Sequence, residues 1–353
     1  MSKIKVLYVI DRIMIGGAEQ VFVDILKLMQ GRVEPFVLLI SRTEPQQLQR
    51  IDGLANVFQL NRSSKLAITS LIKTHRIVKS VDLLHVHLRP TLRYINLVRL
   101  LTRSRTPIIF HDHHHISSIG CINQLLMFNL FPIDYYLAVN EDVLLWARDN
   151  WKFKSSGFLL NFPPTDKTER VLNLNDSLES HLDYQGLVCV GNIKKAKNQL
   201  FATLFGQELH ETVVFYGNNQ DIEYYNELIN QNGIIVIEGE NNPSVYFNNY
   251  KFGLCTSRSE SGPLVILEYF VAGLPFLSYK TGGIADVLFK YVPEYFLDTF
   301  ELNDWIERYE QLNSNYKRIP IELIEMVLEK EFNREEYANE LMNIYTKCLK
   351  SAF

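Results

Sequence analysis

The sequence predicts an α/β protein built from two doubly wound, Rossmann-like domains in tandem. Short apolar runs rich in β-branched residues alternate with segments long enough for helices, which is typical of parallel sheets buried on both faces. The chain of 353 residues is too long for one ordinary core. Near its middle, the prolines of Asn161-Phe-Pro-Pro-Thr165 interrupt the alternation, because they continue neither a helix nor a central strand.

The predicted elements form two series, one on each side of this break. The first series opens with a strand at Lys5–Ile10, a glycine turn and a helix from about Ala18 to Met29. Its further strands are 36–40, 83–87, 107–110 and 135–139. The second series has strands at 186–190, 213–216, 234–237, 252–255 and 275–278. In such sheets the ligand lies in the crevice at the carboxyl ends of the strands.

We therefore expect a first domain at 1–163 and a second domain at 164–330. Residues 301–349 have the pattern of charged amphipathic helices. The C-terminal helix, within 331–353, is expected to pack back toward the first domain.

Composition describes a globular chain with 47% hydrophobic and 22% charged residues. The opening apolar run is too short for a signal peptide or a membrane span, so we expect a cytoplasmic protein. The cysteines lack CxxC spacing, which favours buried thiols over a zinc site or disulfides. They are Cys121, Cys189, Cys255 and Cys348.

Charge is divided unevenly along a chain whose net charge is −4. Residues 1–165 hold 20 Lys and Arg against 12 Asp and Glu, whereas the remaining residues hold 16 against 28. The basic half is suited to an anionic partner. We expect no nucleic-acid partner.

Two glutamates, Glu260 and Glu268, flank the start of a predicted helix with Pro263 in its first turn and Ser261 or Gly262 as its cap. A helix amino end favours phosphate, and carboxylates accept hydrogen bonds from vicinal hydroxyls. The arrangement suits a nucleotide sugar, with hydroxyls at both ends and a diphosphate between them. The alternative is a solvated loop acid and an exposed helix position.

The segment from Ser257 to Asp286 resembles the E-x7-E region of the retaining glycosyltransferases of family 4, which have the two-domain GT-B fold. The departures are Ser261-Gly262 for Gly-Phe, Tyr269-Phe270-Val271 for Ala-Met-Ala, and Asp286 for Glu. The matching residues are Ser257, Glu260, Pro263, Glu268, Gly273, Pro275, Gly282 and Gly283.

Three other stretches resemble the same family. Gly16-Gly17-Ala18-Glu19 is similar to its G-G-A-E loop, and His111-Asp112 follows a strand as its His-Asp pair does. Lys197 matches the family's phosphate-binding lysine, but Asn192 stands at the arginine position, so Lys194 or Lys195 is expected to supply the second charge.

The resemblance implies transfer of a sugar, with retention, from a nucleoside diphosphate sugar to a glycan or lipid-linked oligosaccharide. UDP-sugar is the expected donor, with no cofactor and no obligatory metal, and the expected setting is bacterial capsule, exopolysaccharide or lipopolysaccharide assembly. The expected catalytic residues are Glu260, His111 and Lys197. The expected donor-binding residues are Gly16, Gly17, Asn192, Lys194, Lys197, Ser261, Gly262, Pro263, Leu264 and Glu268. The expected acceptor residues are His85, His87, Arg89 and His113, although His85 and His87 also fit packed positions.

A metal site is not favoured, since the consecutive histidines His113 to His115 point in different directions and no carboxylate pair accompanies them. An arginine-rich amphipathic segment could dock on the anionic inner face of the cell membrane, or it could be an ordinary surface helix. Its residues are Arg89, Leu92, Arg93, Ile95, Leu97, Val98, Arg99, Leu100, Leu101, Arg103 and Arg105. Alternative functions are a non-catalytic nucleotide-sugar-binding subunit, a GT-B sugar-nucleotide epimerase and a glycogen-type synthase.

Overall fold

The computed structural model describes residues 3–62, 67–114, 133–163, 186–240 and 242–350. It divides into two compact units, each with its own sheet. The first unit comprises Met1–Met14, Ala18–Leu160 and Arg334–Phe353, and the second comprises Ile15–Gly17 and Asn161–Asn333.

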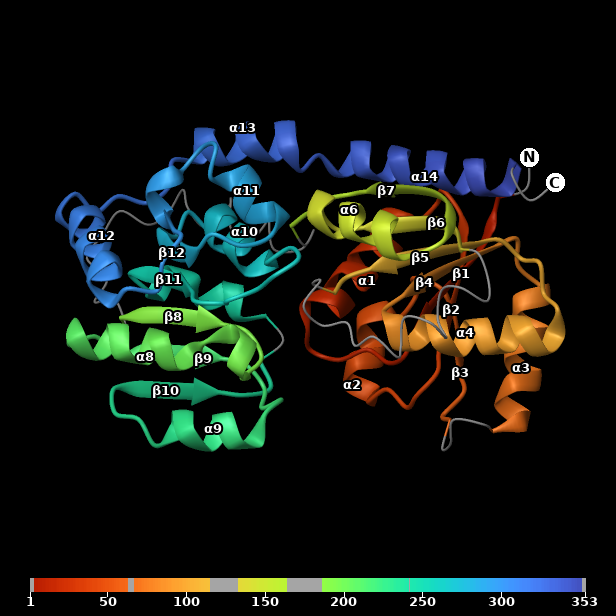
Figure 1. The fold of residues 1–353 in the computed structure, drawn as a ribbon, viewed down its shortest axis with the longest axis horizontal. Helices are drawn as coiled ribbons and strands as arrows, with labels where there is room; N and C mark the ends of the chain where they lie inside the picture. Colours follow the sequence, from red (N-terminus) through yellow and green to blue (C-terminus); the bar gives the residue numbers. More distant parts are fainter. Residues whose placement is uncertain (1–2, 63–66, 115–132, 164–185, 241, 351–353) are drawn as a thin grey trace. The chain divides into compact units, whose positions relative to one another are not determined.

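Within the described residues, the first unit holds a seven-stranded parallel sheet in the order β3-β2-β1-β4-β5-β6-β7 (Figure 1). Its strands are β1 (Lys5–Ile10), β2 (Glu34–Leu39), β3 (Asn56–Gln59), β4 (Leu83–His87), β5 (Ile108–Asp112), β6 (Ile133–Ala138) and β7 (Phe153–Phe158). Its helices are α1 (Gly17–Leu28), α2 (Pro45–Leu48), η1 (Gln49–Ile51), α3 (Ile68–Lys79), α4 (Arg89–Thr102), α6 (Glu141–Asn150) and α14 (Arg334–Lys350).

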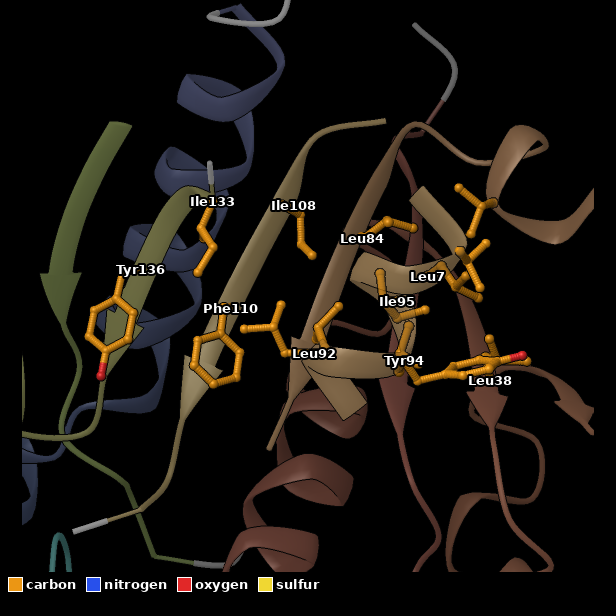
Figure 2. Packing of buried hydrophobic residues seen from close by; sticks show 14 of the residues in the cluster. Leu7, Leu38, Leu84, Leu92, Tyr94, Ile95, Ile108, Phe110, Ile133 and Tyr136 are labelled. Carbon is orange, nitrogen blue, oxygen red and sulfur yellow. The ribbon is translucent and has the colours of Figure 1, made fainter. Parts of the chain in front are cut away.

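The two faces of this sheet differ in chemistry. One face is apolar and packs on α4, where Figure 2 shows Leu84 and Ile108 of the sheet together with Leu92 and Ile95 of the helix. Full burial of such a side chain stabilises the fold by about 1.5–3 kcal/mol. The other face carries histidines, and side chains from α1 and α14 contact it. Apolar packing thus fixes β4 and β5, and these strands position the histidines.

The second unit holds, among its described residues, a six-stranded parallel sheet in the order β10-β9-β8-β11-β12-β13. Its strands are β8 (Leu187–Val190), β9 (Val213–Tyr216), β10 (Ile234–Ile237), β11 (Phe252–Cys255), β12 (Phe276–Tyr279) and β13 (Phe296–Leu297). Its helices are η3 (Lys195–Lys197), α8 (Gln199–Glu208), α9 (Ile222–Ile229), η4 (Pro243–Asn249), α10 (Leu264–Val271), α11 (Gly283–Leu288), η5 (Pro293–Tyr295), α12 (Leu302–Ser314) and α13 (Ile321–Glu331).

Three strands are absent from the sequence-based prediction, namely β3, β7 and β13, and each lies at an edge of its sheet. β3 and β7 expose much of their length, so they lack the continuous apolar pattern of the central strands. The predicted helical region at 301–349 comprises α12, α13 and α14, and α14 lies against β6 of the first unit.

Candidate functional site

The loop between β11 and α10 carries the first of the two predicted glutamates. α10 begins at Leu264, and Pro263 occupies the capping position with φ −70° and ψ 94°. Because this ψ lies outside the helical region, the helix starts one residue later than expected. The prediction that Ser261 or Gly262 caps a helix with Pro263 in its first turn is therefore wrong.

Glu260 forms an ion pair with Lys197, which lies 63 residues earlier in the chain. The two side chains are only 16% and 22% exposed. Burial raises the pKa of Glu260, but the Lys197 charge and hydrogen bond outweigh it, so this pKa lies below its usual value. Burial lowers the pKa of Lys197, but the Glu260 carboxylate outweighs it and raises this pKa. Both groups are therefore charged at neutral pH.

Backbone contacts hold three loops together around this ion pair. The Arg258 amide donates to the Ala196 carbonyl oxygen at 3.0 Å, and the Glu260 amide donates to Thr281 Oγ1 at 3.2 Å. These residues follow β8, β11 and β12 in the chain. The ion pair thus lies at the carboxyl ends of the strands, where doubly wound sheets bind ligands.

Gly282 permits the close approach of two of these loops. Its φ is +82°, and a Cβ atom there would lie 2.9 Å from the Glu260 carbonyl oxygen and 3.0 Å from that of Ser261. The Gly283 amide donates to the same Ser261 oxygen at 3.1 Å. Glycine is required here for both its backbone conformation and its lack of a side chain.

The remaining predicted donor residues of this segment lie at the start of α10 or in it. Ser261, Pro263 and Leu264 are buried, whereas Gly262 and Glu268 are half-buried. Glu268 lies one helical turn beyond Leu264. Their contacts with a nucleotide sugar stay predictions.

Asn192, at the position of the expected arginine, donates from Nδ2 to the Ile15 carbonyl oxygen at 3.3 Å. Ile15–Gly17 belong to the second unit, with Gly16 half-buried and Gly17 exposed at the start of α1. Lys194 is half-buried. A neutral amide cannot replace the arginine charge, and the expectation that Lys194 or Lys195 supplies the second charge stays a prediction.

In the first unit, four histidines share one face of the sheet. β4 pairs with β5 so that His87 lies opposite His111, and residues two positions apart on a strand point to the same face. His85 therefore lies on the same face as His87, and His113 lies on the same face as His111. Their ring centroids are close, at 4.4 Å for His85–His87, 5.1 Å for His87–His111 and 4.2 Å for His111–His113.

Three of these rings, His85, His87 and His111, are completely buried, and His113 is half-buried. His85 Nδ1 lies 2.8 Å from the hydroxyl of Tyr345 in α14, and His87 Nδ1 lies 3.0 Å from His113 Nε2. Burial lowers the pKa of all four rings, that of His85 to about 3, so they are neutral. The predicted contacts of His111 with a sugar, and of the others with an acceptor, stay predictions.

Arg89, expected to contact the acceptor, has its guanidinium buried against Asp112. Its Nη2 lies 2.8 Å from Oδ2, its Nε donates to both carboxylate oxygens, and its guanidinium lies over the Trp151 ring. The Tyr136 hydroxyl also donates to Oδ2, at 2.9 Å. This ion pair gives Arg89 a structural role, and its acceptor contact stays a prediction.

Asp112 remains ionised in this buried position. Burial raises its pKa, but hydrogen bonding from His114 and the charge of Arg89 outweigh burial and lower the pKa to about 2. Arg89 and Asp112 therefore form an ion pair within the packed interior of the first unit.

The arginine-rich segment expected at a membrane surface is α4, and its apolar side lies in the core. Leu92, Ile95 and Val98 are completely buried, and two of the arginines, Arg89 and Arg99, are buried as well. The buried part of the helix packs in the core, and docking of the segment on a membrane through its exposed residues stays a prediction. The exposed residues of this segment are Arg93, Leu100, Leu101, Arg103 and Arg105.

Two predicted features, Cys121 and His115, lie outside the described residues. Cys189, Cys255 and Cys348 are buried thiols, as expected. Among the described residues, no helix is both long and apolar enough to cross a membrane.

Sequence reasoning missed two residues that support the predicted sites. The hydroxyl oxygen of Thr281 accepts a hydrogen bond from the Glu260 amide. The position of Thr281 directly before the Gly282-Gly283 pair could have indicated this contact in the sequence. Tyr345 contacts His85 across 260 residues of chain, and nothing in the sequence pattern indicates this contact.

A family model described as Glycosyl transferases group 1 matches residues 175–322 of the chain. The matched range includes Lys197, Glu260 and Glu268. No curated protein matches the sequence.

Solved structures resemble the chain over nearly its whole length. HepE of Anabaena, in complex with UDP and glucose, has a TM-score of 0.77 and 15% identity, covering 96% of this chain and 99% of that chain. A glycosyltransferase from Rickettsia africae has a TM-score of 0.72 and 14% identity, covering 99% and 100%. The apo lipopolysaccharide outer core galactosyltransferase WaaB has a TM-score of 0.67 and 15% identity, covering 98% and 100%. The predicted α/β architecture of two Rossmann-like domains in the GT-B class is therefore confirmed.

Proposed function

We propose that the protein is a retaining glycosyltransferase of family 4 that moves a sugar from a UDP-sugar to a hydroxyl of a glycan or lipid-linked oligosaccharide. The observation that carries this proposal is the Lys197–Glu260 ion pair beside the start of α10. The group 1 family match, the GT-B fold and the UDP and glucose bound by HepE support it.

Within this proposal, Lys197 holds the donor diphosphate. Its ammonium carries three N–H donors, so it can bind Glu260 and phosphate oxygens together. The amides at the start of α10 add partial positive charge. Glu260 accepts hydrogen bonds from the sugar hydroxyls, and Glu268 accepts them from the ribose.

The acceptor oxygen attacks the anomeric carbon as the bond from that carbon to the diphosphate breaks. Attack on the face from which the diphosphate leaves retains the configuration, and a diphosphate oxygen takes the acceptor proton. Lys197 and the helix amides stabilise the growing negative charge, so the reaction requires no metal. Lys194 and the amides of Gly16 and Gly17 complete the anion site.

The first unit holds the acceptor in this proposal, and its basic balance suits an anionic lipid-linked glycan. Arg93, Arg103 and Arg105 are exposed and could hold the enzyme at the inner face of the cell membrane. The setting is cytoplasmic assembly of capsule, exopolysaccharide or lipopolysaccharide.

A non-catalytic nucleotide-sugar-binding subunit is the second candidate. Asn192 favours it, because the residue at the arginine position is neutral and its amide donates to the Ile15 carbonyl oxygen. Such a protein would bind the donor without turning it over.

The test is to incubate the protein with UDP-, GDP- and dTDP-sugars and candidate acceptors, and to measure nucleotide release and thermal stabilisation. We expect release with a UDP-sugar and an acceptor. Thermal stabilisation without release, with every acceptor, would instead establish the binding subunit.

Variants assign the roles of the two glutamates. Glu260→Ala should lower kcat/KM by at least about 100-fold, as loss of a charged contact to the reacting group does. Glu268→Ala should mainly weaken UDP binding. Glu227→Gln, an exposed position in α9, is the control and should leave both unchanged. Full activity in Glu260→Ala would refute the role given to Glu260.

A further inference from the structure

Three completely buried histidines of the first unit present ring nitrogens to one another. One nitrogen from each of His85, His87 and His111 lies within 4.8 Å of the other two. In the part of the chain that the structure describes, Nε2 of His85, Nε2 of His87 and both ring nitrogens of His111 have no hydrogen-bond partner. An unpaired buried polar group costs about 1–3 kcal/mol. Three such groups side by side point to a shared ligand.

We propose that a divalent transition-metal ion such as zinc binds to His85, His87 and His111. Imidazole nitrogen is a preferred ligand of zinc, copper, iron and nickel. A set of three nitrogens without a carboxylate does not suit calcium or magnesium, which take oxygen ligands. The neighbouring carboxylate, Asp112, points to the opposite face of β5 and is bound to Arg89.

Outer hydrogen bonds orient two of the three rings. The Tyr345 hydroxyl donates to Tyr8 at 3.1 Å, so its oxygen accepts from His85 Nδ1 at 2.8 Å. This places the proton of His85 on Nδ1 and leaves the lone pair on Nε2. His87 Nδ1 lies 3.0 Å from His113 Nε2, and donation from His87 in this contact would leave its lone pair on Nε2. Zinc-binding histidines are held by such partners.

The spacing of the three nitrogens is close to that of a metal site. Tetrahedral zinc with bonds of about 2.0–2.1 Å keeps its ligand atoms roughly 3.4 Å apart. From separations of at most 4.8 Å, the nitrogens close on the ion by small rotations of the rings. Water would take the fourth position.

His113 is the half-buried member of the group, and its ring lies 5.2 Å from that of His87 and 4.2 Å from that of His111. Of the four rings, that of His113 is the most exposed.

The sequence argued against a metal site only for the consecutive histidines His113 to His115. The structure assembles a different set, because strand pairing brings β4 beside β5 and stacks every second residue on one face. As zinc ligands, His85, His87 and His111 would not make the sugar and acceptor contacts expected of them from the sequence. The proposed metal residues lie in the first unit and the Lys197–Glu260 pair in the second, so the two proposals can be tested separately.

The test uses the full chain, freed of metal with a chelator, dialysed against zinc and analysed for bound metal. We expect one zinc per chain in the wild type and none above the buffer level in His87→Gln. His210→Asn is the matched control, since His210 is exposed and asparagine tolerates its φ of 55°; it should keep one zinc. Tyr345→Phe keeps the ligands and should bind zinc about 10–100-fold more weakly.

A second measurement needs no variant and covers the case in which His87→Gln fails to fold. X-ray absorption of the zinc-loaded wild type should show a nitrogen and oxygen shell with scattering from three imidazole rings. Absence of bound zinc in the wild type, a full zinc content in folded His87→Gln, or a shell with fewer than three rings would overturn the proposal.

Discussion

The ring of Tyr269 occupies the space in which a side chain at position 253 would stand. A Cβ atom on Gly253 in β11 would lie 2.6 Å from Tyr269 Cδ2 and 2.7 Å from Cε2. The ring is completely buried, its hydroxyl donates to the Val188 carbonyl oxygen at 3.2 Å, and it accepts from the Val190 amide at 3.2 Å. Tyr269 stands where the pattern of the resembling family has alanine, and Gly253 on β11 leaves room for its ring.

Gly253→Ala should therefore destabilise the second unit by about 1–3 kcal/mol, since the added methyl group overpacks the core. Denaturation in urea, followed by circular dichroism, measures the change. In a Tyr269→Ala background the same substitution should cost almost nothing, although Tyr269→Ala is itself costly. An equal cost in both backgrounds would show that the ring is not the obstacle.

The buried Arg89–Asp112 pair leads to a prediction for the first unit. Asp112→Asn should destabilise it by about 3–5 kcal/mol, because the guanidinium then remains buried without an opposite charge. Thermal denaturation measures the loss. Asp149→Asn changes an exposed carboxylate of α6 and should leave the melting temperature nearly unchanged. A loss of similar size in both variants would contradict the prediction.

The fold follows from local patterns that the sequence displays. A central strand such as β1 is buried and mostly apolar along its length because helices cover both of its faces. The edge strands β3 and β7 are partly exposed and mix polar with apolar residues, so they carry no such pattern. Their pairing depends on the neighbouring strand, which the local sequence does not encode.

The sequence predicted which residues belong to the sites but not which of them contact one another. The resemblance identified Lys197 and Glu260 separately, but their contact depends on how loops after β8 and β11 are tied together. Likewise, His85 and His87 were visible as alternating residues of one strand. Their meeting with His111 depends on the order and register of β4 and β5, which are tertiary properties.

The Lys197–Glu260 pair predicts the pH dependence of stability. The lowered pKa of Glu260 gives a contribution that is present above its unfolded value, about 4.3, and is lost as pH falls through the folded value. The raised pKa of Lys197 gives a second contribution to stability, which is present below the unfolded pKa of about 10.4 and is lost as pH rises through the pKa of the folded state. The difference in unfolding free energy between wild type and Glu260→Gln should stay constant between these limits and shrink in acid. Urea denaturation across pH tests this, and a step near pH 7 would contradict it.

Alanine substitutions at Gly282 and Gly239 distinguish the effect of backbone strain from the effect of displacing the Glu260 loop. Both glycines have a left-handed φ, +82° and +80°, but a Cβ at Gly282 meets the Glu260 carbonyl oxygen at 2.9 Å, whereas a Cβ at Gly239 meets nothing within 4 Å. Each substitution by alanine should cost about 1–2 kcal/mol of stability from the backbone alone. Only Gly282→Ala should also move Glu260 and weaken binding of the UDP-sugar, by about tenfold, which corresponds to about 1.4 kcal/mol. Titration calorimetry with the UDP-sugar and no acceptor measures this difference, and equal affinities in the two variants would show that the position of the Glu260 loop does not govern donor binding.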